Sequence, residues 1–142
     1  MRASAVRAAI IAAVLAATSD SKAGAADKLR CYKGAVEPDA TQDRVFTVRL
    51  IAGPMKDDSN TCDAFVATYQ VSVFHAAAGD IDDRIAAENE RIERALRSSA
   101  LIADEADIMD AQLGNPSVEE SASQLVSRRD VTVLYRLDAA VL

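Results

Sequence analysis

The sequence predicts an α+β fold in which an antiparallel sheet of about four strands is covered by an N-terminal helix and a central helix, within a single domain over residues 1–142. Two observations lead to this prediction. Three segments alternate apolar and polar residues as half-buried strands do, and one segment between them repeats apolar residues at helical spacing. Half of the residues are apolar but only 4% are aromatic, so the core is expected to consist mainly of Val, Ile, Leu and Ala.

The first two predicted strands form a hairpin. In residues 44–52, Phe46, Val48 and Leu50 share one face, with Thr47 and Arg49 on the other. Residues 62–75 place Phe65, Ala67, Tyr69, Val71 and Val73 on one side, and Thr68, Gln70 and Ser72 on the other. The intervening residues 53–61 begin with Gly-Pro and then become polar, which predicts an exposed connection.

The central helix is predicted within residues 79–99, where Ile81, Ile85, Ile92 and Leu96 form an apolar stripe. The stripe is interrupted at Glu88 and Asn89. Acidic residues come first in this segment and arginines come late, in accord with the helix dipole.

The last two strands are predicted at residues 106–113, where the alternation is weak, and at residues 131–137, where it is regular. In the weak strand Ile108, Asp110 and Gln112 should face opposite to Met109, Ala111 and Leu113. The sequence GNPS at residues 114–117 predicts a turn.

The N-terminal 26 residues fit two interpretations. Two arginines, a run of apolar residues from Ala8 to Ala17 and a following group of small residues have the layout of a secretory signal peptide. The same Ala-rich segment also fits the first helix of the folded domain. The choice affects Cys31 and Cys62, which would form one disulfide in an exported protein and be reduced inside a cell.

The composition argues against several classes of protein. With 16 basic and 22 acidic residues, the net charge is −6, which disfavours direct binding to nucleic acid. No apolar run approaches the roughly 20 residues of a membrane-spanning helix. His75 is the only histidine and there is no Cys-x-x-Cys pair, so we expect no metal site and no cofactor. An enzyme that uses His75 with a cysteine is the weakest of the hypotheses, and we expect no catalytic residues.

In its order of segments, the chain resembles the tail terminator proteins of lambdoid, long-tailed bacteriophages. The segments that carry the resemblance are AVRAAIIAAVL, a loop with Pro38, RVFTVRL, a polar connection, YQVSVFH, DIDDRIAAENERIERAL and VTVLYRLD. Related ring proteins of the head-to-tail junction share much of this layout. The strongly hydrophobic opening helix and the two cysteines depart from it.

The resemblance implies a structural virion protein without an enzymatic step. It would be assembled in the host cytoplasm and form a homo-hexameric ring at the head-proximal end of the tail. Its partners would be the major tail tube protein and a head-closure or connector protein, with DNA only as cargo in the lumen. The first helix would then be retained, with Val6, Ile10 and Val14 facing the sheet, and the cysteines would be reduced.

Candidate contacts between subunits or rings lie in the exposed polar segments 53–61 and 114–123, which also fit ordinary solvated turns. Arg128 and Arg129 are the only adjacent pair of basic residues, and they are available to acidic residues of a neighbouring subunit. The candidate residues are Lys56, Asp57, Asp58, Asn115, Glu119, Arg128 and Arg129. The alternative function is an exported periplasmic binding domain with a cleaved signal peptide and a disulfide between Cys31 and Cys62.

Overall fold

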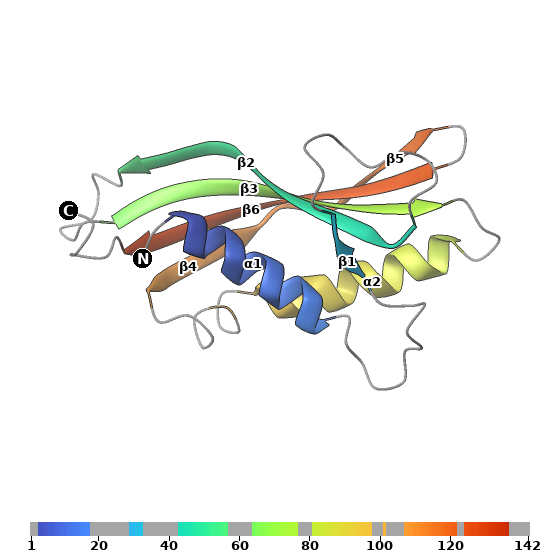
Figure 1. Ribbon diagram of the computed structural model, residues 1–142, viewed down its shortest axis with the longest axis horizontal. Coiled ribbons are helices and arrows are strands. Elements are labelled where there is room, and N and C mark those ends of the chain that lie inside the picture. The colour runs from blue at the N-terminus through green and yellow to red at the C-terminus, as the bar shows by residue number, and fades with distance from the viewer. Residues whose placement is uncertain are drawn as a thin grey trace.

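The computed structural model describes residues 3–17, 29–32, 43–56, 64–76, 81–97, 101, 107–121 and 124–136. The elements in chain order are α1 (Ala3–Ala17), β1 (Arg30–Cys31), β2 (Val45–Lys56), β3 (Ala64–Ala76), α2 (Ile81–Leu96), β4 (Ile108–Leu113), β5 (Ser117–Ser121) and β6 (Gln124–Arg136). Both helices lie on the same side of a long, twisted sheet (Figure 1). Within these residues, no helix has both the length and the apolar character needed to cross a membrane.

The sheet has six strands, arranged in the order β1-β2-β3-β6-β4, and β5 also pairs with β6. The α+β class is confirmed, but the expected sheet of about four antiparallel strands is only partly right. Strand β1 pairs with β2 in parallel orientation, whereas all the other pairs are antiparallel. Two-residue β1 and five-residue β5 are too short to show an alternating pattern in the sequence.

The main core lies between the helices and the sheet. From α1 it takes Val6, Ile10, Ala13 and Val14, and from α2 it takes Ile92 and Leu96, all of which are buried. The expected packing of Val6, Ile10 and Val14 into the domain is therefore what the structure shows. Each fully buried aliphatic side chain of this size stabilises the fold by roughly 1.5–3 kcal/mol, so α1 contributes substantially to the core.

The opposite face of the sheet carries a smaller apolar cluster at one end. It consists of Val45, Phe74 and Val126, with Tyr32 packed against it. The sheet is therefore buried on both faces at this end. This explains why Thr47 and Ser72 are buried although the alternation predicts an exposed face for them.

Strand β4 departs from the predicted alternation. Ile108 and Ala111 are both buried, whereas Gln112 is exposed. The register between β4 and β6 shifts between Ile108 and Asp110, which is a bulge that turns Ala111 towards the core face. The prediction that Ile108, Asp110 and Gln112 share one face is wrong for this reason.

Two expected connections contain strand instead. Strand β2 continues through residues 53–56, and β5 occupies residues 117–121, within the segment predicted as turn and loop. Strand β6 begins at Gln124, seven residues before the predicted strand. Because β3 has 13 residues, all 13 residues of β6 can pair with it, including those without an alternating pattern.

Candidate functional site

Strand β2 lies next to the edge of the sheet, and its outer side is covered only over its first residues. Backbone N–H groups of β1 and of the residue after it donate hydrogen bonds to the carbonyl oxygens of Arg44 and Phe46, at 3.0 and 2.9 Å. The next outward carbonyl, that of Val48, accepts a hydrogen bond of 2.8 Å from Nε of Arg7 on α1. Beyond this point no strand among the described residues covers the edge.

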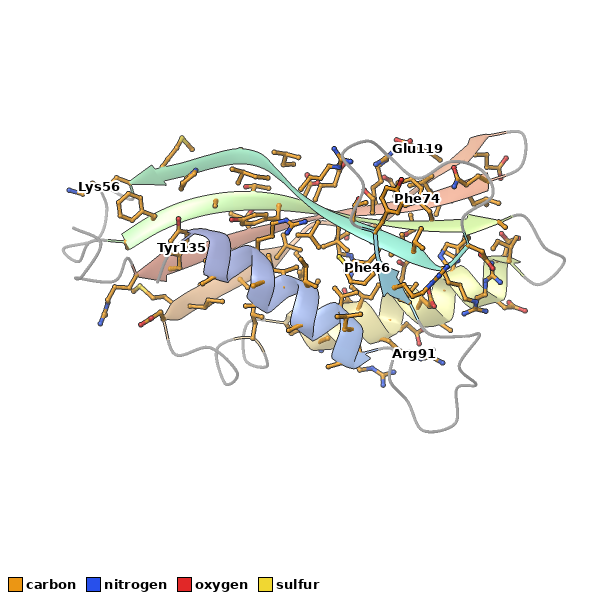
Figure 2. The ribbon with its side chains drawn as sticks, in the orientation of Figure 1. Phe46, Lys56, Phe74, Arg91, Glu119 and Tyr135 are labelled. Carbon is orange, nitrogen blue, oxygen red and sulfur yellow. The ribbon has the colours of Figure 1, made fainter. Side chains whose placement is uncertain are left out.

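The uncovered part of β2, Leu50–Lys56, is referred to below as the β2 arm. Every residue of the arm is exposed, and three of them are large and apolar: Leu50 is 47%, Ile51 is 48% and Met55 is 62% exposed. Leu50 is opposite Tyr69 on the helix face and Met55 is opposite Val66 on the other face, so the arm is an uncovered strand with apolar side chains exposed on both faces. In Figure 2 the arm ends at Lys56, at the far end of the molecule from Glu119 on β5.

The shape of the arm follows from Gly53 and Pro54. Gly53 has a φ of +82°, and a Cβ atom at this position would lie 2.6 Å from the carbonyl oxygen of Val66 on β3. Pro54 has no N–H to donate to a further strand. The pairing with β3 also shifts register twice in the arm. These features prevent a regular ladder on the outer side and leave the side chains available for contacts.

A pocket of about 220 Å³ lies on the sheet face away from the helices. It is lined by Val66, Asp110, Gln112, Thr132 and Leu134 of β3, β4 and β6. Two of its walls are aliphatic and three are polar, and the Thr132 hydroxyl is held by a hydrogen bond of 3.1 Å with the hydroxyl of Thr68. The pocket is therefore lined by two aliphatic side chains together with a carboxylate, an amide and a hydroxyl group.

The candidate contact residues predicted from the sequence are distributed over the molecule. Lys56 is exposed at the end of the arm and Asn115 is exposed between β4 and β5. Glu119 is exposed on β5, and its Oε2 lies 3.3 Å from Nε of Arg128. Asp57 and Asp58 lie outside the described residues. Of the described candidates, the structure brings Glu119 and Arg128 into contact and places Lys56 at the far end of the molecule from Glu119.

Arg128 and Arg129 point to opposite faces of the sheet. Besides Glu119, Arg128 donates a hydrogen bond of 2.9 Å to Oγ of Ser72 and lies over the ring of Phe74 at 5.8 Å. Arg129 is only 7% exposed, on the helix side, and its Nη1 lies 4.0 Å from Oε1 of Glu93 on α2. Burial lowers the pKa of Arg129, while Glu93 opposes this shift. The sequence pattern did not reveal that these neighbours have different surroundings.

A cluster of ionisable groups is buried between the first half of α2 and the sheet. Glu88 and His75 are 2% and 1% exposed, and Oε2 of Glu88 lies 3.5 Å from Nε2 of His75. The other carboxylate oxygen of Glu88 accepts a hydrogen bond of 3.4 Å from Arg44. Burial raises the pKa of Glu88 to about 7, against the opposing effect of Arg44 and Arg84.

The same burial lowers the pKa of His75 to about 4, helped by Arg84 and opposed by Asp43. Asp43 links this cluster to the backbone, because its Oδ1 accepts hydrogen bonds from the N–H of Ala76 at 2.9 Å and from Arg84 at 3.0 Å. At neutral pH the imidazole is therefore uncharged. The His75 ring is buried among side chains of its own chain and is not accessible to a ligand. This burial fits a structural role of the cluster.

The sequence did contain one sign of this cluster, the break in the apolar stripe of α2 at Glu88 and Asn89. In the structure both residues contact polar groups of the sheet, since Oδ1 of Asn89 accepts a hydrogen bond of 3.0 Å from Ser127. The two polar residues in the apolar stripe of α2 thus indicated a layer of polar contacts between the helix and the sheet. Its partners are Arg44, just before β2, His75 of β3 and Ser127 of β6, so only the tertiary structure could identify them.

Cys31 is a half-buried free thiol, and its Sγ lies 4.0 Å from the carbonyl oxygen of Tyr32. Cys62 lies outside the described residues. Within the described ranges, no group of three or more His, Cys, Asp or Glu side chains is arranged to hold a metal ion.

In comparisons with known proteins, no family model matches the chain, and no curated protein is significantly similar to it in sequence.

Proposed function

We propose that this chain is a structural virion protein that forms a ring, caps the phage tail tube and stops its polymerisation. The ring would also join the tube to the head-closure or connector protein. The proposal rests on the resemblance of the segment order to tail terminator proteins and on one structural observation. That observation is the β2 arm, an uncovered sheet edge with three exposed apolar side chains.

The mechanism is geometric. A ring of identical subunits presents one face to the last ring of the tube and a different face to the head, so no further tube subunit can add. Six copies are expected. The net charge of −6 per chain would allow DNA to pass through the lumen without being held.

The burial of α1 supports the interpretation in which this helix is part of the working protein. Removal of residues 1–26 would take Val6, Ile10 and Val14 out of the core and free the Val48 carbonyl from Arg7. Such a loss would expose a large apolar area of the sheet. The alternative, an exported periplasmic binding domain, requires this removal together with an oxidised cysteine pair.

Two measurements test the proposal. Electron microscopy and native mass spectrometry of the purified protein should show rings, and addition of the protein to polymerising tail tube protein of the same phage should shorten the tubes. Tubes of unchanged length with a saturating amount of the protein would contradict the capping function. A mature protein that begins near Ala26, with oxidised cysteines, would instead favour the exported binding domain.

A further inference from the structure

We propose that the β2 arm of one copy docks beside β4 of a second copy, with Met55 seated in the pocket lined by Val66, Asp110, Gln112, Thr132 and Leu134. This inference rests on the ring-forming function proposed above and names the two surfaces that build the ring. The occupant of the pocket is thus a side chain of the same protein.

The topology places the arm and β4 at the same end of the sheet. Through the register Leu50↔Tyr69 to Lys56↔Phe65, the arm pairs with the first half of β3. That half of β3 pairs with residues 131–135 of β6, which in turn pair with β4. The arm and β4 are therefore the two outer edges of one four-strand section, and both appear at the left in Figure 1. A neighbouring copy placed side by side brings its arm next to β4.

Met55 is on the correct face for this contact. It is the cross-strand partner of Val66, Val66 pairs with Leu134, and Leu134 pairs with Asp110. Directly opposed residues point to the same face of a sheet, so Met55 lies on the face that carries the pocket. A cavity of about 150 Å³ can hold a benzene molecule, and the pocket of about 220 Å³ has room for a thioether side chain.

The charges of the two surfaces are complementary. Within Val45–Lys56, both charged residues are exposed cations; Arg49, opposite Gln70, lies on the pocket face, whereas Lys56, opposite Phe65, lies on the helix face. The receiving face carries the carboxylates of Asp110, in the pocket, and of the exposed Asp130, together with one exposed cation, Arg136, two residues beyond Leu134. Opposite charges across such a contact favour association and fix its orientation.

The contact is made by side chains instead of a continued backbone ladder, because Pro54 and the two register shifts interrupt the outer edge of the arm. Each copy uses two different surfaces, the arm and the pocket. Such a heterologous contact generates a closed ring when the rotation between copies closes.

Disulfide trapping tests the contact directly. The protein carries Met55→Cys and Gln112→Cys, with Cys31→Ser and Cys62→Ser to remove the natural thiols. Within one chain, three strand spacings of about 4.8 Å each separate β2 from β4, which is well beyond the limit of about 7 Å between the Cα atoms of a disulfide. A mild oxidant should therefore link copies into disulfide-bonded dimers and larger species, and a reductant should return them to single chains.

The matched control carries Ser117→Cys on β5, at the other end of the sheet, in place of Gln112→Cys, and its copies should form no disulfide link under the same oxidant. Equal linking in both proteins, or none in either, overturns the inference. If the wild type forms rings by native mass spectrometry while the Met55 and Gln112 pair does not link, the ring uses other surfaces and the proposed function stands. If neither rings nor links form, both proposals fail.

Charge reversal gives a second test that does not depend on new thiols. One protein carries Arg49→Glu, and another carries Asp110→Lys and Asp130→Lys. Each alone should lose at least tenfold in self-association, and an equimolar mixture should form a 1:1 complex because the reversed charges are again complementary. Circular dichroism checks that both proteins fold, and absence of the mixed complex from folded proteins overturns the inference.

Discussion

Glu88 of α2 and His75 of β3 are buried side by side, with Oε2 and Nε2 3.5 Å apart. Because burial raises the pKa of Glu88 to about 7 and lowers that of His75 to about 4, the pair is neutral in the folded protein between these values. In the unfolded chain, where the ordinary pKa values are 4.5 and 6.5, both groups are charged between about pH 4.5 and 6.5. The two states hold the same number of protons.

It follows that this pair adds almost no pH dependence to stability in that window, and that single substitutions should reveal two opposite slopes. In Glu88→Gln, only His75 remains. Its folded pKa is lowered, so the unfolded chain binds more protons and the free energy of unfolding should rise between about pH 4 and 6.5. In His75→Gln, only Glu88 remains. Its folded pKa is raised, so stability should fall between about pH 4.5 and 7.

Each slope should reach up to about 1.4 kcal/mol per pH unit, measured by urea denaturation at several pH values and taken relative to the wild type. Glu90→Gln is the control, because Glu90 is exposed on the outer side of α2. If stability changes with pH in the same direction in both buried variants, the pKa values of Glu88 and His75 are not shifted in opposite directions.

Gly53 should resist replacement. Gly53→Ala places a Cβ atom 2.6 Å from the carbonyl oxygen of Val66 and forces alanine to a φ of +82°, so a loss of roughly 1–3 kcal/mol in the free energy of unfolding is expected. Gly114→Ala is the matched control, since the nearest atom to its Cβ lies at 3.6 Å. Urea denaturation measures the free energy of unfolding of both variants and of the wild type. Equal losses in the two variants would mean that the Gly53 backbone is not constrained.

The helix α1 should contribute to the stability of the mature protein. Ile10 is fully buried, so Ile10→Ala should lower the free energy of unfolding by about 2–5 kcal/mol. Ala12→Ser on the exposed side of the same helix should change it by less than about 0.5 kcal/mol. If thermal or urea unfolding of Ile10→Ala is indistinguishable from that of the wild type, α1 is not part of the folded core.

Arg129 should be replaceable by an apolar residue of similar length. Its Nε and Nη1 atoms are buried and have no hydrogen-bond partner among the described residues, so Arg129→Met should be neutral or stabilising by up to about 3 kcal/mol, the cost of buried unsatisfied polar atoms. Arg128→Met should instead cost roughly 1 kcal/mol, because it removes the hydrogen bond to Ser72 and the pair with Glu119. The midpoints of urea denaturation of Arg128→Met and Arg129→Met are compared with that of the wild type. A larger loss for Arg129→Met would indicate an essential contact with Glu93.

The sequence by itself determined the long, regular elements. Ile85, Ile92 and Leu96 recur at helical spacing in α2, and the residues of β3 from Ala67 to Val73 alternate, since one face of each element is buried. Periodicity records burial on one face, so it located these elements and assigned the α+β class. It also marked Glu88 as an unexpected polar residue on a buried stripe.

Only the tertiary structure decided the features that depend on a partner. Strands β1 and β5 exist because β2 and β6 offer edges to pair with, and two to five residues are too few for a pattern. The bulge in β4 and the surroundings of Arg128 and Arg129 likewise depend on which strand or helix lies opposite. The arm and β4 lie at opposite edges of the sheet, more than 50 residues apart in the chain, so no local pattern relates them. Their relation appears when the chain has folded and the uncovered edges are known.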